Sequence, residues 1–144
     1  MKTATGLLLG VLWLTGCATS TVETRKQERY GAYSALPAET RGLVDQSQIK
    51  VGMSMDAVYI AWGKPTQILN AESAQGATTT WLYHGSYIDE YRYWTYRYSY
   101  YGHCYPAGPY LDYSYYPRSY VRSMVVFETG VVKEWRHLPQ PVGY

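Results

Sequence analysis

The tyrosines of this chain are concentrated in one stretch, and this clustering constrains the fold more than any other feature. The chain has 144 residues with 18 Tyr and one Phe, and thirteen of the Tyr lie between residues 87 and 120. Residues 90–100 alternate between two faces. One face holds Trp94, Tyr96, Tyr98 and Tyr100, and the other holds Tyr91, Tyr93, Arg97 and Ser99. A period of two residues predicts a β-strand.

A dense cluster of Gly and Pro follows at residues 102–109, and Tyr110–Tyr116 then resumes the Tyr-rich composition. Two similar runs around a turn cluster predict one long β-hairpin over residues 87–120. A tip at residues 102–109 would place residues 81–83 opposite residues 127–130. We expect Pro117 to force a bulge or to lie on an unpaired edge, because it has no backbone N–H.

Two helices are predicted before the Tyr-rich stretch. Pro37 suits a first helical turn, and this helix should end near residues 45–47. In the second helix Ser54 is a suitable N-cap and Gly63 a suitable stop. Its apolar stripe has helical spacing and consists of Met55, Val58, Tyr59 and Trp62.

Three strands are predicted from β-branched and aromatic runs at residues 78–83, 121–128 and 131–137. Two helices packed on one face of a three-stranded antiparallel sheet would bury a core, so we expect an α+β domain over residues 37–138 with a tail at 139–144. The residues expected in that core are Met53, Val58, Trp62, Trp81 and Tyr83.

The N-terminus has the pattern of an export signal. Lys2 is followed by a short apolar run at residues 6–14 and by small residues up to Cys17. Such a signal, here residues 1–16, is excluded from fold reasoning. The polar residues 17–36 show no sustained apolar period and predict a flexible tether.

The segment Leu14-Thr15-Gly16-Cys17 resembles the lipobox of bacterial lipoproteins. The resemblance implies cleavage between Gly16 and Cys17, a diacylglyceryl thioether on Cys17 and acylation of the new amine. Because Ala18 follows Cys17 in place of Asp, it also implies an anchor in the outer membrane, on the periplasmic side. The alternative is ordinary signal cleavage after Ala18, with no lipid.

Several short motifs together resemble the SmpA/OmlA (BamE-like) lipoprotein family. They are Gly52-Met53-Ser54, Val58, Trp62-Gly63-Lys64-Pro65, Trp81-Leu82-Tyr83 and the closing Phe127-Glu-Thr-Gly130-Val131 hairpin. The resemblance covers residues 37–84 and 121–138 and implies an ααβββ fold with a role in outer-membrane protein assembly. The hairpin at residues 87–120 departs from the family pattern, and shared topology alone does not define function.

Composition and motifs exclude several classes of protein. A net charge of +2 without a basic block disfavours nucleic-acid binding, and no apolar run approaches the roughly 20 residues that span a bilayer. His84, His103 and Cys104 do not complete a metal site, because two of them are adjacent and no further ligand joins them. We expect no enzyme activity, no cofactor, no metal and no small-molecule substrate.

The Tyr-rich hairpin is the candidate binding surface, since Tyr, Trp and Arg dominate protein interfaces. The candidate partner-binding residues are Tyr91, Tyr93, Trp94, Tyr96, Tyr98, Tyr100, Tyr113 and Tyr115. Four Arg (Arg92, Arg97, Arg118 and Arg122) are expected to stack on Tyr rings. We expect a non-catalytic scaffold that binds an outer-membrane assembly component. The alternatives are a carbohydrate-binding or adhesive lipoprotein, an inhibitor-like module, and a low-complexity loop that is merely tolerated.

Overall fold

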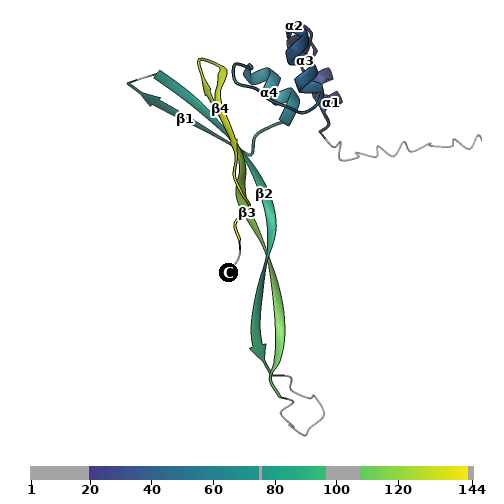
Figure 1. The fold of residues 1–144 in the computed structure, drawn as a ribbon, viewed down its shortest axis with the longest axis vertical. Coiled ribbons are helices and arrows are strands. Elements are labelled where there is room, and N and C mark those ends of the chain that lie inside the picture. Colours follow the sequence, from purple (N-terminus) through teal and green to yellow (C-terminus); the bar gives the residue numbers. More distant parts are fainter. Residues whose placement is uncertain (1–19, 75, 97–107, 143–144) are drawn as a thin grey trace, which may run out of the picture.

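The computed structural model describes residues 20–74, 76–96 and 108–142. These form a four-stranded antiparallel sheet with four helices gathered at one end (Figure 1). The helices are α1 (Val22–Glu28), α2 (Tyr30–Ala35), α3 (Ala38–Asp45) and α4 (Met55–Trp62). The strands, in the order of the chain, are β1 (Gln67–Ser73), β2 (Gly76–Thr95), β3 (Tyr110–Glu128) and β4 (Val131–His137).

The predicted ααβββ architecture is therefore wrong, because the sheet has a fourth strand and two more helices precede the predicted pair. The individual helices predicted after Pro37 and Ser54 are present as α3 and α4. The three predicted strands are present within β2, β3 and β4. The error lies in the elements that sequence patterning left unassigned.

The unpredicted strand β1 lies at the edge of the sheet and pairs with β2, with Gln67 opposite Leu82 and Ser73 opposite Gly76. All seven of its residues are exposed. A strand that buries neither face needs no alternation of apolar and polar residues, so β1 carries no period-two signal. Thr66 extends the pairing, because its N–H donates to the carbonyl of Leu82 at 2.8 Å.

The two unpredicted helices, α1 and α2, lie in the segment 17–36 that was expected to be a flexible tether. Thr21 caps α1 in a reciprocal capping box with Thr24. Arg25 of α1 is only 7 % exposed. Its guanidinium donates to the carbonyls of Ile60 and Ala61 in α4, at 2.8 and 3.0 Å, so it caps the C-terminal end of that helix.

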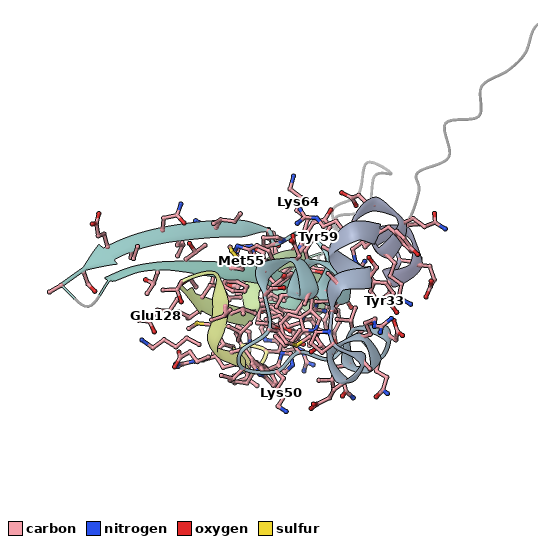
Figure 2. The ribbon with its side chains drawn as sticks, turned by 90° about the horizontal axis from the view of Figure 1, so that it is seen from above. Tyr33, Lys50, Met55, Tyr59, Lys64 and Glu128 are labelled. Carbon is pink, nitrogen blue, oxygen red and sulfur yellow. The ribbon has the colours of Figure 1, made fainter. Side chains whose placement is uncertain are left out.

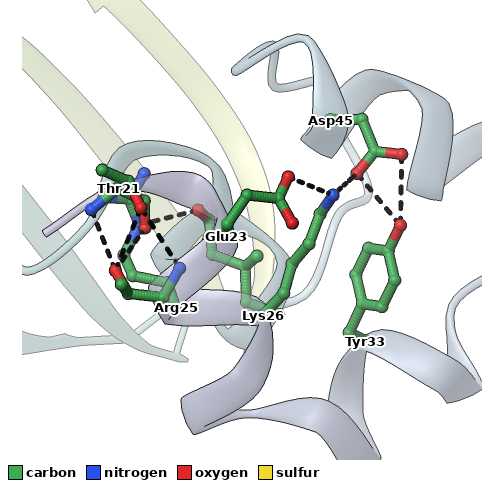
Figure 3. A network of polar contacts seen from close by, with 8 residues as sticks. Thr21, Glu23, Arg25, Lys26, Tyr33 and Asp45 are labelled. Carbon is green, nitrogen blue, oxygen red and sulfur yellow. Dashed lines mark hydrogen bonds and ion pairs between the residues drawn. The ribbon is translucent and has the colours of Figure 1, made fainter.

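A polar network joins the first three helices (Figure 3). Lys26 of α1 forms ion pairs with Glu23 at 2.9 Å and with Asp45 of α3 at 2.6 Å. The hydroxyl of Tyr33 in α2 donates to Asp45 at 3.0 Å. The hydrogen bond from Lys26 holds the pKa of the Asp45 carboxyl below its usual value, and the same bond raises the pKa of Lys26.

The core lies between α4 and one face of the sheet, and Figure 2 looks down on the side chains that crowd this space. Ser54 caps α4 by accepting from the N–H of Ala57, and Gly63 ends the helix with a positive φ of 86°. The predicted core is confirmed for Met53, Val58, Trp81 and Tyr83, which are buried. Trp62 packs against the core but is only partly buried.

Candidate functional site

The β2–β3 hairpin extends far beyond the sheet, as Figure 1 shows. β1 pairs with β2 only as far as Leu82, and β4 pairs with β3 only from Ser123 onward. Residues 84–95 and 110–121 therefore form a two-stranded ribbon, called the arm below, which continues for roughly 40 Å at the usual rise of a strand. The predicted long hairpin is confirmed.

The predicted register of the hairpin is wrong. Trp81 pairs with Val125 and Tyr83 with Ser123, not with residues 127–130. The pairing continues to Thr95 opposite Tyr110, so the segment that joins the two strands starts before the Gly and Pro cluster. Taking that cluster as the centre of the turn displaced every predicted pair.

Of the two features expected at Pro117, a bulge or an unpaired edge, the bulge is found at Arg122 instead. Tyr83 pairs with Ser123 and the next residue, His84, pairs with Val121, so Arg122 has no partner on β2. Pro117 pairs in register with Ile88. It lies on the part of β3 that β4 does not reach, so the expectation of an unpaired edge at Pro117 is confirmed.

The arm has two faces, and the predicted binding residues are divided between them. The Trp94 face carries residues 88, 90, 92 and 94 of β2 and 111, 113, 115 and 117 of β3, while the Tyr91 face carries the residues between them. Trp94, Tyr113 and Tyr115 lie on the first face, and Tyr91 and Tyr93 lie on the second. Tyr96 follows the end of β2. Tyr98, Tyr100, Gly16 and Cys17 lie outside the described residues.

Aromatic side chains on the Trp94 face are open to solvent. Trp94 is 69 % exposed, Tyr115 is 61 % exposed and Tyr113 is 43 % exposed. Arg92 lies between them, with its guanidinium 5.7 Å from the centre of the Tyr113 ring and its Nε 2.6 Å from a carboxylate oxygen of Glu90. This carboxylate raises the pKa of Arg92. The face therefore combines flat rings with a fixed ion pair.

The expected stacking of Arg on Tyr is confirmed at two positions. Besides Arg92, the guanidinium of Arg118 lies 6.0 Å from the centre of the Tyr116 ring and forms an ion pair with Asp89 at 3.7 Å. Arg97 lies outside the described residues. The contact between Arg92 and Tyr113 joins β2 to β3, whereas Arg118 and Tyr116 both lie on β3.

The Tyr91 face is held by contacts between rings. Tyr91 and Tyr93 stack with their centres 6.0 Å apart, and Tyr87 meets Tyr120 edge to face at 5.9 Å. Gly85 makes room for the Tyr120 ring, because a Cβ at Gly85 would lie 2.9 Å from the Cε1 atom of that ring. At the start of the arm, an aromatic ring covers a glycine of the neighbouring strand.

A hollow of about 670 Å³ at the root of the arm was not predicted from the sequence. Trp62 is one of the residues that line it, and its ring lies 5.4 Å from the ring of Tyr83, 6.0 Å from Trp135 and 5.4 Å from the stacked ring of His137. Arg122 also lines the hollow. In the sequence, the signal for this hollow was the spacing of Trp135 and His137, which lie two residues apart on one strand and so share a face.

The hollow contains a Ser–His contact, with Ser123 Oγ 2.7 Å from Nδ1 of His137. Ser123 is only 2 % exposed, although it is one of the residues that line the hollow. Within the described residues, no carboxylate is hydrogen-bonded to His137. The contact joins β3 to β4. The described residues include no group of three or more metal-ligating side chains.

No family model, curated protein or solved structure matches this chain. The resemblance to the SmpA/OmlA lipoproteins therefore stays a prediction from the residues that carry it. Among the described residues, no helix has both the length and the apolar character needed to cross a membrane.

Proposed function

We propose that this chain is an exported lipoprotein, anchored to the outer membrane through Cys17, that acts without catalysis by binding another protein through the arm. The observation that carries the proposal is the arm itself, whose aromatic side chains stand in solvent while the helices and the core lie at the other end. Its role would be that of a scaffold or accessory factor in outer-membrane protein assembly.

The chemistry of the arm favours a protein partner. Tyr, Trp and Arg supply large rigid surfaces and dominate the energy of protein interfaces. A bare two-stranded ribbon with exposed rings is marginally stable alone and prone to aggregate, so a partner that covers it removes a liability. The partner would bury Trp94, Tyr113 and Tyr115 in particular, since these three exposed rings lie on the same face of the arm.

The proposed anchor would make this binding efficient. The lipobox-like segment Leu14–Cys17 implies three acyl chains, and two membrane-binding groups already give stable attachment. Confinement at one membrane raises the effective concentration of the domain for a partner in the same membrane. Mass spectrometry of the mature protein should find a triacylated Cys17, and an unmodified chain beginning at Thr19 would contradict the anchor.

The partner can be identified by photo-crosslinking in intact cells. A photoreactive amino acid at Tyr113, on the Trp94 face, should capture subunits of the β-barrel assembly machinery. The same amino acid at Lys133 on β4 is the matched control, because its side chain is comparably exposed but lies outside the arm. Recovery of peptidoglycan or surface glycans alone from Tyr113 would overturn the proposal.

The second candidate is carbohydrate binding, and the Trp94 face favours it. Trp94, Tyr113 and Tyr115 share one flat side with the polar groups of Glu90 and Arg92. Rings of this kind can stack on sugars while the polar groups accept and donate hydrogen bonds. Retention of the intact protein on cell-wall polysaccharide, lost in Trp94→Ala, would support this function over the first.

A further inference from the structure

The two long edges of the arm differ in what they offer to another strand. On β2, the carbonyl of Leu82 accepts from Thr66 N at 2.8 Å and the N–H of His84 donates to Thr66 Oγ1 at 3.1 Å. Even-numbered residues of β2 therefore direct their backbone groups to the outer edge. No register shift on β2 interrupts this alternation, because the extra residue of the bulge is on β3.

The outer edge of β2 in the arm consequently presents the backbone N–H and C=O groups of Ser86, Ile88, Glu90, Arg92 and Trp94. Within the described residues, no backbone hydrogen bond joins these groups to another segment. Residues 87–92 line a hollow of about 690 Å³ together with the C-terminal residues Gln140–Val142. Five consecutive outward positions are thus available for strand pairing.

The outer edge of β3 is protected instead. Pro117 pairs with the even-numbered Ile88, so its backbone nitrogen also points outward from the ribbon. A proline there cannot donate a hydrogen bond to an added strand. The edge available for strand addition is therefore that of β2.

We propose that the outer edge of β2 in the arm pairs antiparallel with the same edge of a second copy of this chain, with Glu90 of each copy opposite Arg92 of the other. In this register the two-fold axis passes between the two Tyr91 residues. Ile88 of each copy then lies opposite Trp94 of the other. Both of these side chains are 69 % exposed in the single chain. Pairing converts a two-stranded ribbon into a four-stranded sheet.

Charge selects this register over its neighbours. In an antiparallel pair the outward-directed, even-numbered residues of the two strands must lie opposite one another. The register can therefore shift only by two residues at a time. A shift in one direction places Glu90 opposite Glu90, and a shift in the other places Arg92 opposite Arg92. Like charges directly opposite are destabilising, whereas the proposed register forms two Glu–Arg pairs.

The proposal goes beyond the proposed function, because it uses an edge of the arm and leaves both of its faces open. The Trp94 faces of the two copies would lie on the same side of the joined sheet, since an axis perpendicular to a sheet preserves its sides. A partner protein or a glycan would meet a surface of doubled width. Failure to form the pair would leave the binding of a partner by one copy untouched.

The register is tested by cysteine cross-linking of the full chain in membranes, with Cys104→Ser as the background. Tyr91→Cys should give a disulfide-linked dimer on mild oxidation, because opposite residues at the axis have suitable Cα separations. Asp89→Cys and Tyr93→Cys are matched controls on the same face. Each should give little dimer alone and efficient dimer when the two variants are co-expressed. The background chain without an added cysteine should give none.

Charge exchange provides a second, independent test. In the Tyr91→Cys background, adding Glu90→Arg or Arg92→Glu places like charges opposite one another, and each should reduce cross-linking at least ten-fold. Co-expression of the two variants should restore it, because each arginine of one chain would then lie opposite a glutamate of the other. Restored cross-linking could not come from changes within one arm. In each variant chain, residues 90 and 92 still carry the same charge, so only pairing between the two chains can bring opposite charges together. Equal cross-linking in all variants, or no dimer from Tyr91→Cys, would overturn the proposal.

Discussion

The base of the molecule comprises the four helices, β1, β4 and the parts of β2 and β3 outside the arm. The base and the arm share the strands β2 and β3 but are stabilised in different ways. In the base, β2 and β3 are flanked by β1 and β4 and covered on one face by α4, so that Phe127 is 1 % exposed. In the arm, the same strands have no flanking strand and no covering helix among the described residues, and Trp94 is 69 % exposed.

The difference shows where each part of the chain obtains its free energy of folding. Burial of apolar side chains stabilises the base, at about 25 cal/mol for each Å² removed from water. The arm depends on cross-strand pairs of exposed side chains, each contributing roughly 0.2–1 kcal/mol. The base can therefore serve as a stable support, while the arm remains available for contacts with other molecules.

The largest expected effect separates the two regions directly. Phe127→Ala should lower the free energy of unfolding by about 3–5 kcal/mol, because it leaves a cavity beside Trp81, whose ring centre lies 4.8 Å away. Trp94→Ala in the arm should lower it by less than about 0.5 kcal/mol. Urea unfolding followed by circular dichroism measures both. Similar losses from the two changes would mean that the arm belongs to the folding unit of the base.

The next effect concerns α1, one of the two helices that the sequence did not predict. Arg25→Met keeps the apolar stem but removes the donors to Ile60 and Ala61, so unfolding should become easier by about 2 kcal/mol. Arg136→Met is the control, because the Arg136 side chain is 55 % exposed and its ion pair is with Glu134 in the same strand. It should change the unfolding midpoint little. A neutral Arg25→Met would show that α1 is not required for the stability of α4.

A smaller effect is expected where the base meets the arm. Gly85→Ala would place a Cβ 2.9 Å from the Tyr120 ring, and displacing this ring should cost about 1 kcal/mol. The double variant Gly85→Ala/Tyr120→Ala should lose less than the sum of the two single changes, because the clash is then absent. Thermal unfolding of the three variants gives this coupling. Strict additivity would exclude a contact between the two residues.

The smallest effect is a pH dependence confined to the base. The Asp45 pKa is lowered by Lys26, so the folded state favours the ionised carboxylate. The resulting stabilisation is fully present above the unfolded-state pKa of about 4 and disappears as the pH falls through the lower folded-state value. For an exposed pair it should stay below about 1 kcal/mol. Between pH 6 and pH 2, the midpoint temperature of thermal unfolding should fall less steeply in Asp45→Asn than in the unchanged protein. Identical slopes would contradict the assignment.

Sequence patterning predicted the elements that bury one face and missed those that do not. The helical spacing of Met55, Val58, Tyr59 and Trp62 located α4, but of these four only Val58 is buried. The side of α4 that packs most deeply carries Ala57, Val58, Ile60 and Ala61. Residues 67–73 of β1 are exposed throughout, so their order carried no period. In α1 the inward-facing residue is Arg25, and a buried guanidinium looks like a solvent-exposed charge in a sequence.

The candidate site was predicted in outline but not in detail. Alternation located the arm, and the composition of residues 87–120 indicated its aromatic surface. Its register depended on where the turn begins and on the single extra residue at Arg122, and neither leaves a local signal in the sequence. The hollow around Trp62 unites residues from α4, β2, β3 and β4. Such long-range contacts depend on the register of the strands, so they could not be predicted before the register was known.

Under the proposed lipid anchor, the hydrogen bond between Arg25 and the backbone of Ser20 would limit how far the domain can stand from the membrane. Nη1 of Arg25 lies 2.7 Å from the carbonyl oxygen of Ser20, so the chain is already fixed to the base at this residue. If Cys17 bears the lipids, two residues lie between it and Ser20, and the three fully extended Cα-to-Cα steps reach roughly 10 Å. The helical end would then rest at the lipid headgroups, and the arm would determine how far the protein reaches into the periplasm.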